Sequence, residues 1–182
     1  MPPYAYATLA AGCLIWVAPF LLARRKSEAP SKVDRRARWG MALQGIAYAL
    51  LWQGHFWDAV LPMWRFALSV IFLAAAAAFS WTGTQALGPQ WRFDASLSAD
   101  HRLVTTGAYR FVRHPIYCSM LCLGLGFGFM VTPWPLFPLS MVVLIAGTEI
   151  RIRIEDKLLA SRFGESFRQY QQSVPAYIPF TR

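Results

Sequence analysis

Long runs of apolar residues dominate the pattern along the chain. A helix needs about 20 predominantly apolar residues to cross the roughly 30 Å hydrocarbon core of a bilayer. Three runs approach this length, Tyr4 to Leu22, Trp39 to Trp57 and Trp64 to Trp81, and two shorter runs follow, Ile116 to Thr132 and Leu136 to Ile150. The pattern therefore predicts an all-α integral membrane protein with five transmembrane helices.

The last two apolar runs are separated by the sequence TPWP. Pro133, Pro135 and Pro138 are not expected inside a helix, because proline lacks an amide hydrogen and clashes with the preceding turn. We therefore expect residues 116–150 to form a transmembrane helical hairpin. The first apolar run continues directly into ARRK with no small-residue cleavage site, which predicts a retained span and not a signal peptide.

The segments outside the spans are polar. Residues 83–115 mix turn-forming residues with charges of both signs, which predicts a cytoplasmic loop with a short interfacial piece around Trp91 and Phe93. Residues 151–182 keep a helical spacing of apolar residues with a break near Gly164, and then end in the proline-containing stretch VPAYIPF. We expect three spans in residues 1–82, the loop, the hairpin, and a cytoplasmic C-terminal helical segment that covers a ligand.

Composition and charge agree with a membrane protein. Hydrophobic side chains make up 56% of the 182 residues, which is more than one small soluble core buries. Seven of the 18 Lys and Arg residues lie in residues 24–38, four in 92–113 and six in 151–182. Because basic residues favour the cytoplasmic side, this distribution predicts an outside N-terminus and a cytoplasmic C-terminus, with only Arg65 on the outer side. The net charge of +9 is a topology signal, since the sequence holds no nucleic-acid reading motif.

Cysteines and glycines in the spans have structural interpretations. Cys118 and Cys122 share a helix face, but no further Cys or His is spaced to complete a metal site, so we expect no metal. Gly124 and Gly128 are four residues apart and allow a second helix to approach closely, while Gly126 removes bulk from the opposite side. The alternative is that these glycines make room for a ligand.

The stretch GAYRFVRHPIY places charged residues directly before an apolar run. Proline is favourable in the first turn of a helix, so Pro115 predicts that a helix starts near His114. The first amide groups of that helix would then lie at its cytoplasmic mouth, which suits polar or anionic ligand groups. The alternative is that Arg110 and Arg113 extend to lipid headgroups while His114 caps the helix.

A second charged stretch, EIRIRIEDKLL, directly continues the last span. Arg151 and Glu155 are four residues apart and therefore lie on one helix face. Ordinary ion pairing on a solvated helix is one interpretation. Polar groups that continue a membrane span more often face a cavity or a partner than lipid, which favours a functional site.

In their order along the chain, these motifs resemble the isoprenylcysteine carboxyl methyltransferase family. The resemblance covers about residues 103–180, and its ordered combination is more specific than any single motif. It is carried by Gly107 to Tyr109, Arg113 to Tyr117, Arg151, Glu155, Asp156, Leu159, Phe163, Gly164, Phe167, Tyr170, Val174, Pro175, Ile178 and Pro179. The chain departs from the family pattern at Asp156, where Glu is usual, at Phe167, where Tyr is usual, and at Cys118-Ser119, where a Gly commonly follows the tyrosine.

The resemblance implies an integral membrane methyltransferase that uses S-adenosyl-L-methionine without a Rossmann domain. It implies a lipophilic small-molecule or lipid-modified acceptor, with a carboxylate as the methylated group. The implied cofactor-binding residues are Tyr109, His114, Pro115, Tyr117, Glu155 and Tyr170, and the implied catalytic residues facing the acceptor are Arg151 and Asp156. A carboxylate is already ionised at neutral pH, so Arg151 would orient it and no general base is required.

Other functions stay open at this stage. Membrane sterol and steroid reductases, which use NADPH, resemble the same C-terminal arrangement, but they commonly have Asn where this chain has Ile116. A small membrane scaffold or transporter subunit would need none of the charged residues in fixed register. Phospholipid amines and small thiols are alternative methyl acceptors, and for these Asp156 or Glu155 is the nearest candidate base.

Overall fold

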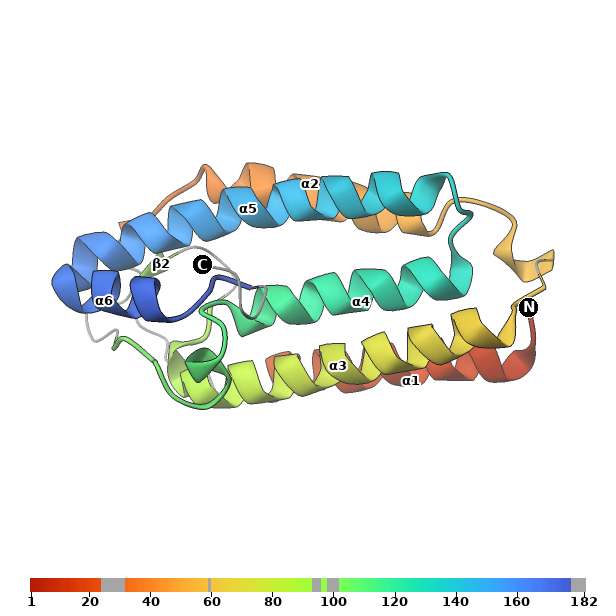
Figure 1. Ribbon diagram of the computed structural model, residues 1–182, viewed down its shortest axis with the longest axis horizontal. Helices are drawn as coiled ribbons and strands as arrows, with labels where there is room; N and C mark the ends of the chain where they lie inside the picture. The colour runs from red at the N-terminus through yellow and green to blue at the C-terminus, as the bar shows by residue number, and fades with distance from the viewer. Residues whose placement is uncertain (24–31, 59, 93–95, 98–101, 178–182) are drawn as a thin grey trace.

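A computed structural model describes residues 1–23, 32–58, 60–92, 96–97 and 102–177. These residues form an elongated bundle of five long helices whose directions alternate along the chain (Figure 1). The long helices are α1 (Pro3–Leu22), α2 (Ala37–Leu51), α3 (Met63–Leu87), α4 (Pro115–Val131) and α5 (Leu136–Phe163). The shorter elements are β1 (Lys32–Val33), η1 (Phe56–Asp58), η2 (Gly88–Gln90), β2 (Ser96–Leu97), η3 (Gly107–Arg110) and α6 (Glu165–Ser173).

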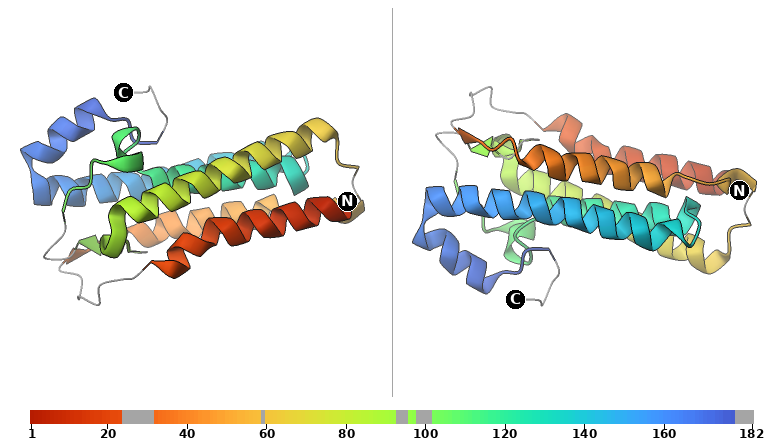
Figure 2. Two further views of the ribbon diagram at one scale, coloured as in Figure 1. Left: turned by 90° about the horizontal axis from the view of Figure 1, so that it is seen from below. Right: turned by 90° about the horizontal axis from the view of Figure 1, so that it is seen from above.

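The helices pack in pairs that are not all consecutive in sequence. α1 packs along α3, α3 along α4, and α2 along α5, which is visible when the bundle is viewed from two sides (Figure 2). The two strands form a two-residue antiparallel pair in which Lys32 is opposite Leu97. The predicted all-helical fold is confirmed for the described residues, apart from this short pair.

Glycines set the close approach of α4 to its two neighbours. A methyl group on Gly124 would lie 2.6 Å from a side-chain carbon of Leu144, and one on Gly128 would overlap the ring of Phe137, both on α5. A methyl group on Gly126 would meet Leu73 of α3 at 2.9 Å. The predicted arrangement, with Gly124 and Gly128 on one side and Gly126 on the other, is confirmed, and the glycines serve helix packing.

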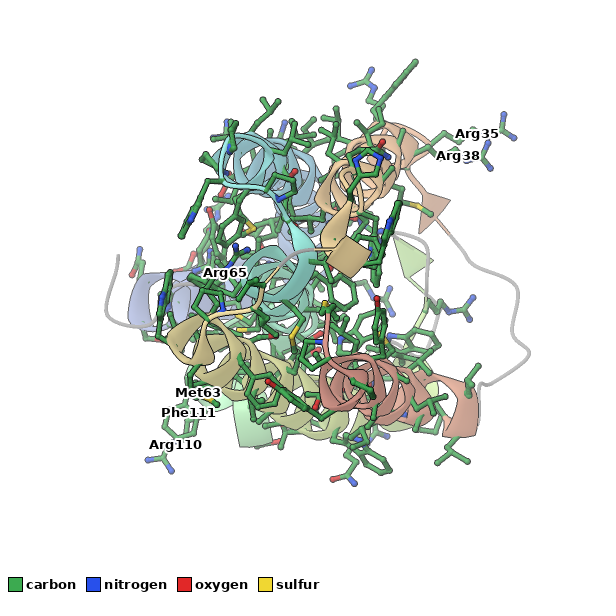
Figure 3. All side chains as sticks on the ribbon, turned by 90° about the vertical axis from the view of Figure 1, so that its right-hand side faces the viewer. Arg35, Arg38, Met63, Arg65, Arg110 and Phe111 are labelled. Carbon is green, nitrogen blue, oxygen red and sulfur yellow. The ribbon has the colours of Figure 1, made fainter. Side chains whose placement is uncertain are left out.

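Polar side chains satisfy backbone groups inside the bundle. Arg65 of α3 donates hydrogen bonds to the carbonyl oxygens of Gly128, Phe129 and Thr132, at distances of 2.7 to 3.0 Å. The last carbonyls of α4 have no partner within their own helix, and they need one where water is scarce. Seen along the bundle from the end near the N-terminus, Arg65 lies at the α3 ribbon while Arg35 and Arg38 project outward beyond α2 (Figure 3).

A proline in α1 links this helix to α3. Pro19 has no amide hydrogen, so the carbonyl of Ile15 loses its normal helical partner. The indole nitrogen of Trp81 donates to that carbonyl oxygen at 2.9 Å. The hydrogen bond therefore compensates for Pro19 and fixes the C-terminal half of α1 against α3.

The observed helix ends differ from the predicted ones at specific residues. α2 stops at Leu51, before the predicted end at Trp57, and Gly54 with a φ of 115° lies in the turn that follows. α3 continues past Trp81 to Leu87 and ends at Gly88, whose φ is 54°. Pro138 lies inside α5, contrary to our expectation. It is the third residue of that helix, where the amide hydrogen has no intrahelical acceptor and its loss costs little.

Two of the described helices are long and apolar enough to cross a membrane, Pro3–Leu22 and Met63–Gln90 when η2 is counted with α3. Only 22% and 28% of the residues in their most apolar windows are buried within the bundle. Pro115–Val131 is a shorter apolar helix. Apolar surface left uncovered over such lengths is typical of helices that face lipid.

Candidate active site

One cavity at the α6 end of the bundle combines polar and apolar walls. Its volume is about 250 Å³. Its lining residues come from the C-terminal half of α1, the end of α3 and the segment after it, η3, the start of α4 and the C-terminal half of α5. The lining residues are Trp16, Val17, Phe20, Leu21, Leu87, Trp91, Arg92, Tyr109, His114, Ile116, Tyr117, Met120, Arg151 and Glu155. Five of the eight residues named from the resemblance thus line one cavity.

The polar wall includes His114, the residue directly before α4. His114 precedes the helix as its N-cap residue and Pro115 occupies the first turn, so the predicted helix start is confirmed. The His114 side chain is buried, with only 6% of its surface exposed. Pro115 does not line the cavity; it is fully buried and lies against Gly83 of α3. The contact between Pro115 and Gly83 holds the mouth of α4 against α3.

Two consecutive acidic residues hold His114 from opposite sides of its ring. Nε2 of His114 lies 2.9 Å from Oδ1 of Asp156, and Nδ1 lies 3.6 Å from Oε2 of Glu155. Successive helical residues project about 100° apart. Glu155 therefore faces the cavity, while Asp156 turns toward Arg113 and Gln171, each 3.2 Å from its Oδ2. Asp156 is not among the lining residues, so its carboxylate holds the imidazole from outside the cavity.

The two acids also shift the protonation of this cluster. Burial on its own would lower the pKa of His114, because the charged imidazole loses its water. The hydrogen bonds and negative charges of Asp156 and Glu155 outweigh burial and raise the pKa of His114 above its ordinary value. Burial alone would raise the pKa of Asp156, but His114 and Arg113 lower it. The cluster therefore favours an imidazolium paired with a carboxylate.

Arg151 and Tyr117 form the deepest part of the polar wall. The guanidinium carbon of Arg151 lies 5.2 Å from the ring centre of Tyr117, within the range of a cation–π contact. One terminal nitrogen of Arg151 is 3.8 Å from Oε1 of Glu155, and the hydroxyl of Tyr117 donates to the same oxygen. The three side chains thus place a cation and a carboxylate side by side in the wall of the cavity.

Tyr109 and Tyr170 lie on either side of the η3 backbone. Tyr109 lines the cavity, and its hydroxyl has no hydrogen-bond partner among the residues that the structure describes. Burial and the charge of Glu155 raise the pKa of Tyr109 well above its ordinary value, so the hydroxyl stays neutral. Tyr170 of α6 does not reach the cavity. Its hydroxyl donates to the carbonyl oxygen of Tyr109 at 2.5 Å, which fixes η3.

A C-terminal strap, defined here as residues 174–177, crosses the start of α4. The backbone amides of Arg113 and His114 donate to the carbonyl oxygens of Pro175 and Ala176 at 2.8 and 2.9 Å. The Arg113 side chain donates to the carbonyl oxygens of Gln171 and Val174. Arg113 therefore points inward and ties the strap to α4, and does not extend to lipid headgroups. Residues 178–182 of the expected cover lie outside the described residues.

The apolar wall was not predicted from the sequence. Trp16 and Phe20 of α1 line the cavity, and Trp16 donates from its indole nitrogen to Oγ of Ser119 at 3.0 Å. Trp91 is buried against Phe20, with 5.2 Å between ring centres, and it is followed by the cavity-lining Arg92. Neither segment carries a motif. The sequence signal that could have indicated it is the Trp91-Arg92 pair in the loop after the third span.

Within the described part of the chain, no group of three or more His, Cys, Asp or Glu side chains is placed to hold a metal ion. The acidic groups of the site are paired with His114, Arg113, Arg151 and Tyr117. The charged, hydroxyl and apolar side chains that line the cavity suit an organic ligand with polar and apolar parts.

The fold is a helical bundle with long, largely uncovered apolar helices, and one cavity at its end combines a polar and an apolar wall. The sequence model of the phospholipid methyltransferase family matches residues 64–166. The matched region contains most of the residues that line the cavity. The chain belongs to this methyltransferase family.

Individual relatives have different named acceptors. Over 159 residues the chain is 31% identical to a protein-S-isoprenylcysteine O-methyltransferase of Schizosaccharomyces pombe, covering 79% of this chain and 67% of that protein. A Saccharomyces cerevisiae protein of the same name is 35% identical, covering 45% of this chain and 34% of that protein. Methanethiol S-methyltransferase 1 of Bradyrhizobium diazoefficiens is 36% identical, covering 44% of this chain and 27% of that protein. The chain thus spans about a third or less of the last two relatives.

Proposed function

We propose that this protein is an integral membrane enzyme that transfers a methyl group from S-adenosyl-L-methionine to a lipophilic acceptor, with a carboxylate as the methylated group. The observation that carries the proposal is the two-sided cavity. Charged and hydroxyl groups of η3, α4 and α5 form one wall, and Trp16, Val17, Phe20 and Leu21 of α1 form the other. A polar cofactor and an apolar acceptor require such opposed walls to meet.

The chemistry of the polar wall fits the cofactor. When bound, S-adenosyl-L-methionine supplies an electrophilic methyl group on a sulfonium cation. Glu155 has 25% of its side chain exposed, so its carboxylate is accessible to a cation or a hydroxyl group. The Tyr109 hydroxyl lines the cavity with no partner among the described residues, and Tyr117 adds an aromatic face. We assign these three residues and His114 to cofactor binding, with Tyr170, Pro115 and Asp156 positioning them.

Arg151 is assigned to the acceptor. It lies in the same cavity and its guanidinium presents paired donors whose geometry matches a carboxylate. An ionised carboxylate needs no general base, so Arg151 only has to hold one oxygen toward the methyl group. Charge is lost when a carboxylate and a sulfonium react, and a cavity with few waters favours such a step.

A thiol or amine acceptor is the second candidate. It is favoured by the similarity to a methanethiol S-methyltransferase and by the position of Glu155, an acid that faces the cavity. Such an acceptor would need a base, and Glu155 is placed to serve, whereas Asp156 is engaged by His114, Arg113 and Gln171. The family membership disfavours an NADPH-dependent reductase.

Cofactor binding by the purified protein tests this proposal. Isothermal titration in detergent should detect binding of S-adenosylhomocysteine, and Glu155→Gln should weaken it by about 1 to 3 kcal/mol because a charged hydrogen-bond acceptor is lost. Glu165→Gln, at an exposed position of α6, is the matched control and should bind like the wild type. Binding of NADPH in place of S-adenosylhomocysteine, or of neither, would contradict the proposal. A labelled methyl donor with prenylcysteine, thiol and amine acceptors then identifies the acceptor class.

We further propose that all five long helices cross the membrane with the N-terminus outside and the C-terminus cytoplasmic. The alternating helix directions bring the start of α2, the start of α4 and α6 to one end of the bundle, and the start of α3 to the other end (Figure 1). Arg35 and Arg38 lie at the start of α2 and Arg110 ends η3, whereas Arg65 lies in the first turn of α3. In a variant without native cysteines, His55→Cys should react with an impermeant maleimide on intact cells, and Gln172→Cys should react only after permeabilisation. The reverse pattern would place the cavity on the outer side, where the cytosolic cofactor is absent.

A further inference from the structure

A second hollow lies outside the bundle, on the opposite side of η3 from the cavity. Its volume is about 880 Å³, and it shares no lining residue with the cavity. We call it the α3 groove. Its floor and walls include Ala75, Ala78, Phe79 and Thr82 of α3, with Arg110 and Phe111 on the other side. Pockets of roughly 300 to 1,000 Å³ are typical of sites that hold small organic molecules.

The polarity of the α3 groove changes along its length. Ala75, Ala78 and Phe79 make the end of the groove near the middle of α3 apolar. Thr82 and Gln85 lie nearer the C-terminal end of α3, which is the end close to the cavity. From Ala75 to Gln85 the helix rises about 15 Å. The groove is therefore apolar toward the middle of the bundle and polar toward its end, as a phospholipid is along its own length.

The positively charged Arg110 lies at the polar end of the α3 groove. Arg110 is exposed and makes no ion pair with a described residue, and Phe111 beside it exposes 68% of its surface. Both side chains project away from the bundle next to α3 (Figure 3). An exposed aromatic ring beside an arginine is typical of the interface between hydrocarbon and headgroups.

We propose that the α3 groove binds an anionic phospholipid, with one acyl chain along Ala75, Ala78 and Phe79 and the phosphate at Arg110. The inference rests on the proposed membrane placement, in which this end of the bundle meets the cytoplasmic headgroups. Anionic lipids are attracted by cations near that surface, and a zwitterionic lipid offers a weaker partner.

Occupancy of the α3 groove is coupled to the cavity through η3. This 3-10 turn runs from Gly107 to Arg110, and its successive residues face different sides: Ala108 and Arg110 line the groove, while Tyr109 lines the cavity. A lipid that holds Arg110 also restrains Tyr109, whose hydroxyl we assign to cofactor binding. Two sites that share one restrained segment are energetically coupled, so anionic lipid strengthens cofactor binding.

Photocrosslinking tests the lipid site without requiring methyl transfer. The purified full-length protein is mixed with a phosphatidylglycerol that carries a diazirine in one acyl chain, irradiated and mapped by mass spectrometry. Crosslinks should concentrate in residues 75–86 and 106–111. Arg110→Gln should reduce them roughly fivefold, the effect of losing one surface cation, and Ala78→Trp should reduce them by filling the groove. Arg38→Gln, an exposed arginine at the same end, is the control and should leave them unchanged.

Two outcomes would overturn the lipid site. Crosslinks spread evenly over the helices, or equal labelling by the phosphatidylcholine analogue, would show a general annulus of lipid and no specific site. Coupling is measured separately, as the affinity for S-adenosylhomocysteine in bilayer discs with and without phosphatidylglycerol. The wild type should bind more tightly with the anionic lipid and Arg110→Gln should not; equal affinities in the wild type would refute the coupling. If the proposed function fails, cofactor binding is lost in both discs while the crosslinks stay in place.

Discussion

The Arg151→Lys protein is expected to bind S-adenosylhomocysteine nearly as tightly as the wild type and to lose about 100-fold in kcat/KM, the scale of a 1 Å misplacement of reacting groups. Lysine keeps the positive charge beside Glu155 but lacks the planar fork that holds a carboxylate in a fixed orientation. The buried stem of Arg151 lies against Gly40 and has room for the shorter lysine. Steady-state kinetics with a saturating methyl donor and calorimetry with the same preparation measure the two effects.

The matched control is Arg153→Lys, at a highly exposed position two residues further along α5, where the side chain forms an ion pair with Glu149. It should leave both quantities unchanged. If Arg151→Lys instead loses cofactor affinity and thermal stability together, Arg151 is a structural ion-pair partner and its assignment to the acceptor is wrong.

Gly40→Ala is expected to be among the most destabilising small substitutions in the protein. A methyl group there would lie 2.6 Å from the carbonyl oxygen of Gly147 and 2.6 Å from Cγ of Arg151. Gly147 is equally tight, since a methyl group on it would lie 2.7 Å from the carbonyl oxygen of Gly40. Backbone faces backbone at this crossing of α2 and α5, so neither helix can yield locally. The free energy of unfolding should fall by about 1 to 3 kcal/mol or more.

Gly45→Ala in the same helix is the control for Gly40→Ala. Apart from its sequence neighbours and the backbone of its own helix, no atom of the described residues lies within 4 Å of the position that its methyl group would occupy. Alanine favours a helix over glycine by about 1 kcal/mol, so this variant should melt at the same temperature as the wild type or higher. Thermal unfolding in detergent measures both variants. Equal melting temperatures for the two would mean that α2 and α5 separate easily, and Arg151 would then lack the rigid support described above.

Sequence patterns predicted much of the fold because each pattern relates residues that are close together in the chain. The apolar runs and Pro115 marked the helices, and the spacing of Gly124, Gly126 and Gly128 predicted which sides of α4 face neighbours. The predicted helix ends were less accurate than the predicted helices. Glycines with positive φ, such as Gly88, end the helices, whereas the predictions followed the change from apolar to polar residues.

The family resemblance named residues of the polar wall on three elements, but none of the α1 residues that form the apolar wall. The resemblance implied that Asp156 faces the acceptor, whereas the structure brings Glu155 to the cavity and Asp156 to His114 and Arg113. The apolar wall of α1 depends on contacts between residues about a hundred positions apart, such as Trp16 with Ser119. No local pattern encodes which helix covers a site, so this wall became known only from the packed bundle.

The C-terminal strap has a consequence for the order of events during biosynthesis. Chain segments leave the ribosome from the N-terminus onward, and the helices that precede the strap can enter the bilayer as they emerge. The amides of Arg113 and His114 find their acceptors only when Pro175 and Ala176 have been made, about sixty residues later. A nascent chain can therefore be fully inserted while its cofactor wall is still open. Under the proposed function, the site that binds the cofactor is therefore completed last, after the helices have entered the membrane.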